Sequence, residues 1–263
     1  MLKITKNSKA DGIRILSRNA VKYLHELELL QGENVEILSY GKNVCCISTD
    51  NPAQIYFMFV FDKEFDCTFF DQVMKNYDDA HSLLVSVQCK DECIFYMCSR
   101  GFRFTSKYKN YIYDKESQGK CNEKVIRLTK DHKSDVDKVS FPKTSGRPPF
   151  STLFDVLVIG KEGGILAYVE NDILLGYLSY VNSVDNVLDV DYIYVDEPYR
   201  RKKIGRTLAS SYASWAVSQG MIPYWGTAIS RESEKTAESA GFICCCEHFH
   251  FEKHGPMSRF STN

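Results

Sequence analysis

The stretch VDEPYRRKKIGR, residues 195–206, links a predicted strand to a predicted helix. Four consecutive cations, Arg200 to Lys203, stand directly before the helix, and Gly205 leaves room for the close approach of a ligand. A helix N-terminus has unpaired backbone N–H groups and a partial positive charge, and therefore binds phosphates. Because cations at this end oppose the helix dipole, their clustering favours a bound pyrophosphate over the alternative of a solvated basic turn.

The patterns on both sides of this loop predict a mixed α/β layer. Two apolar runs, 164–169 and 173–181, are joined by the polar turn Glu170-Asn171-Asp172, which is typical of a β-hairpin. The other predicted elements are a strand at 187–195, a helix at 203–218, a strand at 223–227, a helix at 232–239 and a strand at 246–251.

The two halves of the chain repeat one pattern. In each half an apolar strand precedes a helix that ends at Gly-Phe, and an aromatic strand follows; the two glycines are Gly101 and Gly241. Each glycine fits the left-handed position that ends a helix. This agreement in register predicts an ancient duplication. The N-terminal copy lacks the phosphate loop, because the corresponding stretch, Phe61 to Phe70, has three carboxylates and no glycine or cationic cluster.

Two polar segments suggest how the chain is divided. Asp114 to Asn122 is expected to be a linker, which gives one domain over residues 1–122 and a second over 123–263. The loop from Ser140 to Pro149 lies inside the second domain and is long enough to be functional. We expect the first domain to serve in packing, in a homodimer contact or as one wall of a substrate cleft.

Composition excludes several classes of protein. The chain has 263 residues and a net charge of −1, so nucleic acid is not an expected partner. No apolar run is long enough to span a membrane and no export signal is apparent, so a cytoplasmic protein is predicted. Its ten cysteines include no Cys-x-x-Cys, and although His248, His250 and His254 follow a cysteine triplet, we predict reduced thiols and no metal.

Residues 200–206 resemble the acyl-CoA-binding motif of the GNAT N-acyltransferases, written Arg/Gln-x-x-Gly-x-Gly/Ala. The strand Asp191–Val195 is similar to the strand that precedes the motif, and the helix that ends at Gly241-Phe242 resembles the second signature of the family. The resemblance extends over about half of the chain, from Val125 to Phe251, and is closest to a two-part subgroup with a divergent N-terminal half. It implies a GNAT-like fold in the C-terminal half and a degenerate GNAT-like fold in the N-terminal half.

The resemblance also implies the site residues and the co-substrate, acetyl-CoA. Backbone amides of the loop would hold the pyrophosphate, and the strand ahead of it would pair with the pantetheine arm and polarise the thioester carbonyl. The expected acetyl-CoA-binding residues are Ile193, Tyr194, Val195, Arg200, Arg201, Lys202, Lys203, Ile204, Gly205, Arg206, Ser230 and Ser233. Lys203 departs from the family, which has glycine there. Ser230 and Ser233 fit a helix cap at least as well as a cofactor contact.

Transfer of an acyl group to an amine requires a base, because an ammonium has no lone pair. Asp189 is the first candidate, followed by Asp191 and Glu197, and the two-residue spacing predicts that both aspartates face the same side of the strand. For the general acid, relatives often have a tyrosine where this chain has Ala237; Tyr192, Tyr199 and Tyr212 are substitutes without positional support.

The sequence therefore predicts a tandem N-acetyltransferase that moves an acetyl group directly from acetyl-CoA to a primary amine of a small-molecule or peptide acceptor. One alternative is a catalytically silent CoA-binding or ligand-sensing module, which the departures at Lys203 and Ala237 permit. The other is a tandem aminoacyl transferase, for which the duplication is the argument.

Overall fold

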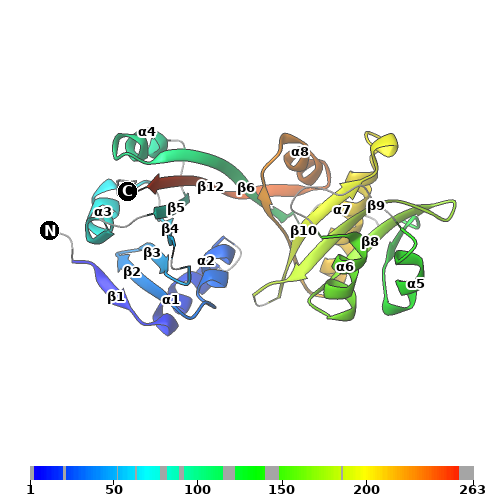
Figure 1. The fold of residues 1–263 in the computed structure, drawn as a ribbon, viewed down its shortest axis with the longest axis horizontal. Helices are drawn as coiled ribbons and strands as arrows, with labels where there is room; N and C mark the ends of the chain where they lie inside the picture. Colours follow the sequence, from blue (N-terminus) through cyan, green and yellow to red (C-terminus); the bar gives the residue numbers. More distant parts are fainter. Residues whose placement is uncertain are drawn as a thin grey trace, which may run out of the picture. The chain divides into compact units, whose positions relative to one another are not determined.

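The computed structural model describes residues 3–19, 22–51, 53–62, 64–77, 82–88, 92–114, 122–139, 148–184 and 186–254. The chain forms two compact units (Figure 1). Unit 1 comprises Met1–Lys109 and Cys246–Asn263, and unit 2 comprises Asn110–Cys245. This division differs from the predicted boundary after residue 122, because the last strand of the chain belongs mostly to unit 1.

Unit 1 contains a mixed sheet, in which seven strands take part wholly or in part. Its elements are β1 (Thr5–Asn7), α1 (Lys9–Leu16), α2 (Leu24–Leu29), β2 (Val35–Tyr40), β3 (Asn43–Ser48), β4 (Ile55–Val60), α3 (Cys67–Met74), β5 (Ser82–Gln88), α4 (Glu92–Ser99), the first part of β6 (Arg103–Tyr113) and most of β12 (Phe242–His254). The strand order β1-β2-β3-β4-β5-β12 is antiparallel except for the parallel pair β4–β5.

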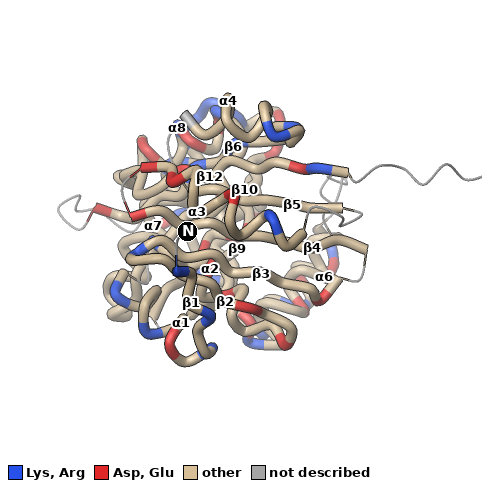
Figure 2. The backbone as a smooth tube through the Cα atoms, turned by 90° about the vertical axis from the view of Figure 1, so that its left-hand side faces the viewer, with Lys and Arg blue, Asp and Glu red and all other residues tan. Residues whose placement is uncertain are grey.

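Helices cover both faces of this sheet. One face packs Phe57 and Phe59 of β4 against Phe69 and Phe70 of α3, and α4 joins the same core through Met97. Alternate residues of the strands, such as Ile37, point to the opposite face, where α1 contacts β2 and α2 contacts β3. Figure 2 shows Lys and Arg interspersed with Asp and Glu along the backbone on one side of the molecule.

The strands of unit 2 also pair in a mixed arrangement. Its elements are β7 (Val125–Arg127), α5 (Lys133–Val136), α6 (Phe150–Phe154), a π-helical turn (Asp155–Ile159), β8 (Gly163–Glu170), β9 (Ile173–Asn182), β10 (Val187–Val195), α7 (Ile204–Ser218), β11 (Ile222–Ala228) and α8 (Arg231–Ser239), with the end of β6 and the start of β12. The strands from β7 to β10 pair antiparallel, whereas β10 and β11 are parallel.

Two hydrophobic cores flank the sheet of unit 2. Helix α7 covers one face with Ile204, Leu208 and Tyr212, which lie on the predicted apolar stripe. The other core includes Phe154 of α6 and Tyr177 of β9. The sequence did not predict α6 or the π-helical turn, and the loop from Ser140 to Pro149 lies outside the described residues except for its last two prolines.

Several predicted turns are confirmed by backbone geometry. Gly101 and Gly241 have φ values of 81° and 97°, the left-handed conformation expected at both helix ends. Asn171 and Asp172 have φ values of 52° and 60°, as a tight hairpin turn requires. The equivalent strand–helix–Gly-Phe–strand segments occur in both halves, with β4–β5 and β10–β11 as the parallel pairs.

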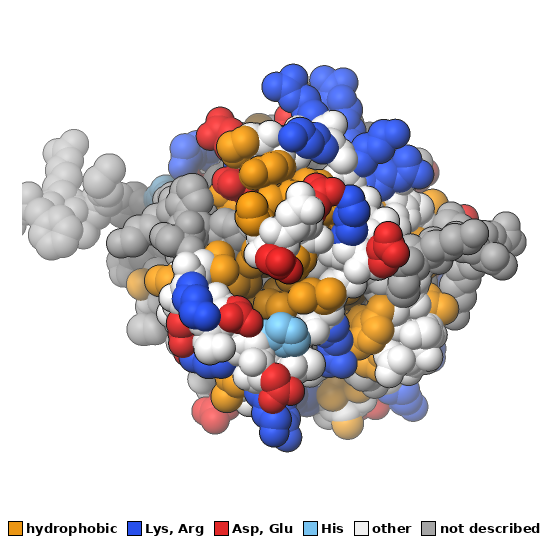
Figure 3. Space-filling model, turned by 90° about the vertical axis from the view of Figure 1, so that its right-hand side faces the viewer, with side chains coloured by type: hydrophobic (Ala, Val, Ile, Leu, Met, Phe, Trp, Pro, Cys, Tyr) orange, Lys and Arg blue, Asp and Glu red, His pale blue; other side chains and the backbone are white. Residues whose placement is uncertain are grey.

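Hydrophobic side chains are exposed on the surface, and the described cysteines are free. Large hydrophobic side chains that are exposed in unit 2 include Val156, Ile159, Ile173, Ile229 and Ile243. Figure 3 shows hydrophobic side chains exposed among charged ones on one face of the molecule. The described cysteines are free thiols, and no described group of His, Cys, Asp or Glu is arranged to hold a metal ion. None of the helices in the described ranges is long and apolar enough to cross a membrane.

Candidate active site

A cavity of about 400 Å³ lies where β10 and β11 separate. The two strands pair from Val187 with Ile222 to Asp189 with Tyr224, and no further pair is recorded in the described part of either strand. The cavity is lined by Val190, Asp191, Tyr192, Ile193, Trp225, Gly226, Thr227, Ile229, Ser230, Glu232, Ser233 and Thr236. The opening between two parallel strands therefore exposes backbone and side-chain groups of both to one space.

The loop between β10 and α7 has the backbone conformation of an anion-binding site. Arg201 and Lys203 both have left-handed φ values, 62° and 65°. Arg200, which precedes them, is extended, and a turn conformation of this kind can direct successive N–H groups toward a concavity that binds anions. Lys203 is the N-cap of α7 and makes no side-chain cap hydrogen bond. The first-turn N–H groups of α7 are thus left for a ligand.

Unit 1 shows the contrasting arrangement at the equivalent helix. Asp66 is the N-cap of α3, and its Oδ1 accepts a hydrogen bond from the backbone N–H of Phe69 at 2.9 Å. A carboxylate from the protein itself therefore takes the place that an anionic ligand would occupy. This explains the sequence difference between the repeats in physical terms.

The cations of the loop differ in what they contact. The Arg200 guanidinium donates from Nε to the carbonyl of Val195 at 3.0 Å and so fastens the loop to the end of β10. Lys202 places its ammonium 4.9 Å from the centre of the Tyr199 ring. Arg201, Lys203 and Arg206 have no ion pair with any described residue.

Gly205 is not required by the fold. A Cβ atom there would lie 3.5 Å from Thr236 and 3.7 Å from Ile193, which are ordinary contact distances. Both of these residues line the cavity between β10 and β11. Gly205 therefore sits where the phosphate loop meets the cavity, and the space it leaves is usable by a ligand.

The backbone of β10 directs alternate residues into the opening. The N–H of Asp196 donates to the carbonyl of Leu175 at 2.9 Å, on the β9 side. Because successive residues of a strand direct their N–H and C=O groups to opposite neighbours, Ile193 and Val195 face β11 and Tyr194 faces β9. The structure thus supports a ligand-facing role for the backbone of Ile193 and Val195 but not of Tyr194.

The two aspartates of β10 are held by different neighbouring strands. Asp189 Oδ1 accepts from the backbone N–H of Gly226 in β11 at 2.7 Å, and Asp191 Oδ2 accepts from Ser179 Oγ in β9 at 3.0 Å. A β-bulge between Val190 and Tyr192 interrupts the alternation on which the predicted common face depends. Asp191 lines the cavity, whereas Asp189 and Glu197 are not among its lining residues.

The two serines of α8 are largely occupied by the protein. Ser230 is the N-cap of α8, and its Oγ accepts from the backbone N–H of Ser233 at 3.1 Å, which confirms the capping interpretation. Ser233 Oγ accepts from the indole N–H of Trp225 at 3.2 Å. Both side chains still line the cavity.

Of the tyrosines considered as general acids, Tyr192 is the one that lines the cavity. Tyr212 is fully buried in α7 and donates its hydroxyl to the carbonyl of Leu188 at 2.5 Å. Burial raises the pKa of Tyr212, with a smaller contribution from Asp189. Tyr212 therefore cannot reach a substrate in the cavity.

Sequence reasoning missed the contribution of β11 to the cavity. Trp225, Gly226 and Thr227 form the wall opposite β10, and Thr227 has a left-handed φ of 57°. A glycine inside a predicted strand is a signal of close approach and was available in the sequence. A Cβ atom on Gly226 would lie 2.8 Å from Asp189 Oδ2.

A mixed sheet thus opens around a cavity with an uncapped cationic loop at one end, an arrangement that suits an anionic ligand. Residues 134–244 match the model of the acetyltransferase (GNAT) family, a stretch that includes β10, the loop, α7 and α8. The matched residues make up less than half of the chain. No curated protein sequence matches the chain.

Solved structures of GNAT proteins are similar to the chain over nearly its whole length. A GCN5-related N-acetyltransferase from Sphaerobacter thermophilus aligns with a TM-score of 0.60 at 12% identity, over 97% of each chain. A GNAT acetyltransferase from Colwellia psychrerythraea aligns with a TM-score of 0.56 at 13% identity, over 96% of this chain and 100% of that chain.

A tandem GNAT protein from the clavulanic acid biosynthesis pathway aligns with a TM-score of 0.52 at 9% identity, over 97% of this chain and 99% of that chain. Identities this low establish the fold alone. The likeness to a tandem protein agrees with the predicted two-part organisation, and the mixed α/β fold class is confirmed.

Proposed function

We propose that unit 2 binds acetyl-CoA between β10 and β11 and transfers the acetyl group directly to a primary amine. The observation that carries the proposal is the continuity of the uncapped loop at residues 200–206 with the cavity, through Gly205 and its neighbours Ile193 and Thr236. The residues present fit the group, since N–H donors and cations stand at one end and a space of about 400 Å³ follows.

Different groups of the chain bind the pyrophosphate and stabilise the negative charge that develops during transfer. Backbone N–H groups from Arg201 to Arg206 hold the pyrophosphate, and Arg200 keeps the loop attached to β10 through the Val195 carbonyl. Bound acetyl-CoA supplies an activated thioester carbonyl. The backbone N–H groups of Ile193 and Val195 face the opening and are placed to stabilise negative charge on an oxygen there.

Asp191 is the base that we assign to the amine. Its carboxylate lines the cavity and is positioned by the Ser179 hydroxyl at 3.0 Å. It would accept a proton from the ammonium of the acceptor, which frees the nitrogen lone pair for attack. Asp189 is engaged by the N–H of Gly226, so we assign it to positioning β11 relative to β10.

The test is to incubate the purified chain with acetyl-CoA and a panel of primary amines, and to measure acceptor-dependent release of the CoA thiol. The panel includes amino sugars, amino acids, polyamines and lysine peptides. The proposal predicts release with at least one amine class and its loss in Asp191→Asn. Binding of acetyl-CoA without release for any acceptor would favour the silent ligand-sensing module instead. Transfer of an aminoacyl group to an amine from an aminoacyl donor, with no CoA thiol released from acetyl-CoA, would favour the tandem aminoacyl transferase.

A further inference from the structure

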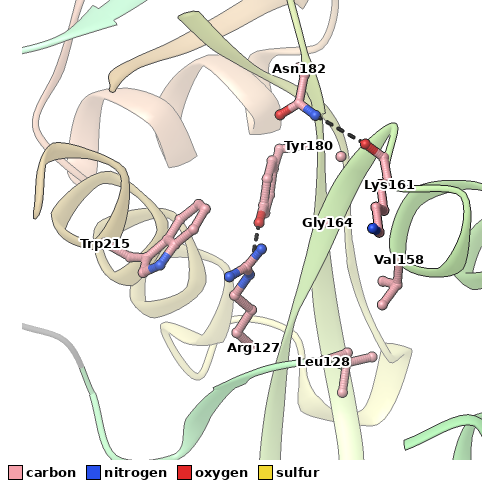
Figure 4. Close-up of a pocket in the computed structure, with 9 residues that line it drawn as sticks. Arg127, Leu128, Val158, Lys161, Gly164, Tyr180, Asn182 and Trp215 are labelled. Atoms are coloured by element: carbon pink, nitrogen blue, oxygen red, sulfur yellow. Dashed lines mark hydrogen bonds between the residues drawn. The ribbon is translucent and has the colours of Figure 1, made fainter. Parts of the chain in front are cut away.

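A second cavity, of about 390 Å³, lies in unit 2 beyond the end of β7 (Figure 4). Strand β7 makes its last pair between Arg127 and Leu166, so the first residues of β8 extend past it. The cavity is lined by Arg127, Leu128, Val158, Lys161, Gly163, Gly164, Tyr180, Asn182 and Trp215. None of these residues lines the cavity between β10 and β11, and the volume falls within the roughly 300–1,000 Å³ of small-molecule sites.

The charge lining this cavity has one sign. Among the described residues that line it, Arg127 and Lys161 are ionised and none is a carboxylate. Neither cation forms an ion pair with any residue in the described ranges, whereas the nearby Lys124 and Lys133 pair with Glu170 and Asp155. Two cations beside one space, without a protein anion, favour an anionic ligand.

Arg127 is held in place before any ligand arrives. Its Nε donates to Tyr180 Oη at 3.1 Å, and its guanidinium carbon lies 4.7 Å from the centre of the Trp215 ring (Figure 4). These two contacts orient the planar guanidinium and leave its two terminal NH₂ groups available. A fixed guanidinium can donate two parallel hydrogen bonds to a carboxylate or phosphate.

The backbone on the other side of the cavity is also fixed. Lys161 has a left-handed φ of 64°, and its carbonyl accepts from Asn182 Nδ2 at 3.3 Å. A Cβ atom on Gly164 would lie 2.2 Å from Tyr180 Oη, so only glycine allows the tyrosine to reach Arg127 here. The cavity therefore depends on a strained lysine and on a close glycine–tyrosine contact.

A backbone donor adds to the two cations. The carbonyl of Ile165 accepts from the N–H of Leu128 at 2.9 Å, so Ile165 directs its backbone groups toward β7. Gly163, two residues earlier on β8, directs its N–H to the same edge. Gly163 also lines the cavity, and β7 has ended at that point, so the alternation predicts that this N–H has no strand partner there.

We propose that this cavity is a second ligand site, distinct from the acetyl-CoA site, which binds the carboxylate or phosphate group of a small molecule. Arg127 provides the bidentate contact, Lys161 adds charge, and Leu128 and Val158 contact the apolar part of the ligand. The site does not depend on the proposed transferase activity.

The test is a fluorescence titration of a Trp225→Phe variant of the full chain, in which Trp215 is the remaining tryptophan. Inorganic phosphate and benzoate are the two probes, added at constant ionic strength with chloride as the balancing anion. We expect a saturable change for at least one probe, and the probe that binds tighter identifies the anion class. Calorimetric titration of the unsubstituted chain with the same probe checks that the Trp225 substitution does not create the binding.

Variants then assign the signal to this cavity. Arg127→Gln should weaken the affinity roughly tenfold or more and Lys161→Gln by a smaller factor. Lys138→Gln, which removes an exposed cation elsewhere in unit 2, and Gly205→Glu, which blocks the other site, should leave the affinity unchanged. The proposal is overturned if neither probe gives a saturable change, if Arg127→Gln binds as well as its parent, or if Gly205→Glu abolishes the signal.

Discussion

Asp189 Oδ1 accepts a hydrogen bond from the backbone N–H of Gly226 at 2.7 Å, at the point where β10 and β11 stop pairing. The Asp189 carboxylate thus pairs with the Gly226 N–H, which lies past the last backbone pair between the two strands. The absence of a side chain at Gly226 permits this contact, since a Cβ atom would lie 2.8 Å from the carboxylate. The pair marks the start of the cavity in which we place acetyl-CoA.

The Asp189–Gly226 hydrogen bond should contribute measurably to the free energy of unfolding. Asp189→Ala removes the acceptor and leaves the Gly226 N–H unpaired, which should lower the free energy of unfolding by about 1–3 kcal/mol. Asp189→Asn keeps a carbonyl oxygen in place and should cost less than half as much. Urea denaturation measures both values. Equal losses in the two variants would contradict the assigned hydrogen bond.

Substitution of the two aspartates of β10 should have different effects on the turnover number. Asp191→Asn should reduce the turnover number roughly a hundredfold or more, because the variant cannot accept a proton, and it should leave acetyl-CoA affinity unchanged. Asp189→Asn should keep most of the turnover. Steady-state kinetics with the best acceptor amine gives the turnover number of each variant. A larger loss in Asp189→Asn than in Asp191→Asn would indicate that Asp189 is the base.

Lys203 occupies a left-handed backbone position, with φ of 65°, that a glycine adopts without strain. Lys203→Gly should therefore raise the free energy of unfolding by up to about 1 kcal/mol. Lys203→Ala removes the charge but keeps the strained conformation, so it should give no gain. Thermal and urea unfolding compare the two. A similar gain in both variants would mean that charge, not backbone strain, is responsible.

Unit 1 contains a buried carboxyl group whose ionisation should destabilise the fold. Glu26 is fully buried, and neither of its carboxylate oxygens has a hydrogen-bond partner among the described residues. Burial raises the pKa of Glu26 from 4.5 to about 7, with a smaller opposing effect of His25. As pH rises from 4.5 toward 7 the unfolded chain loses this proton first, so folding becomes less favourable over that window.

Glu26→Gln should remove the loss of folding stability that ionisation of Glu26 causes as pH rises. The stability of the variant relative to the unsubstituted chain should increase by as much as about 3 kcal/mol between pH 5 and pH 8. Urea denaturation at both pH values gives the difference, and His254→Gln, which changes an exposed side chain, is the control. A difference that does not change with pH would show that Glu26 is not protonated in the folded chain.

Two buried histidines should lower the stability of the fold as pH falls, whereas Glu26 lowers it as pH rises. Burial lowers the pKa of His248 to about 3 and that of His250 to about 4, with smaller contributions from His25. Below pH 6.5 the unfolded chain therefore takes up protons that the folded chain resists, and stability is lost as pH falls toward 3. His248→Gln should flatten this acid limb in the same denaturation series, whereas an unchanged acid limb would contradict the buried neutral imidazole.

The fold of unit 2 could be predicted well because local signals agreed with it. Gly241, the Asn171–Asp172 turn and the stripe on α7 each specify their structure within a few residues. The unit boundary could not be predicted in this way. Residues 248–254 pair with β5 in unit 1, although they are far from β5 in sequence, and no local pattern encodes that partner.

The candidate site could be predicted only in part for the same reason. The loop at 200–206 is contiguous and carries its own signal. The choice between Asp189 and Asp191 depends on a β-bulge and on the separation of β10 from β11, which are set by contacts between strands. The cavity beyond β7 joins residues from five segments and left no motif in the sequence.

The measurement that tests the central claim most directly is calorimetric titration of the purified chain with acetyl-CoA, beside Gly205→Glu and Gly205→Ala. We expect micromolar binding by the unsubstituted chain and loss of binding in Gly205→Glu, because the longer side chain fills the junction of loop and cavity. Gly205→Ala should fold at least as stably, since its Cβ meets only ordinary contacts. No binding at millimolar acetyl-CoA, or equal binding by Gly205→Glu, would contradict an acetyl-CoA site on this loop.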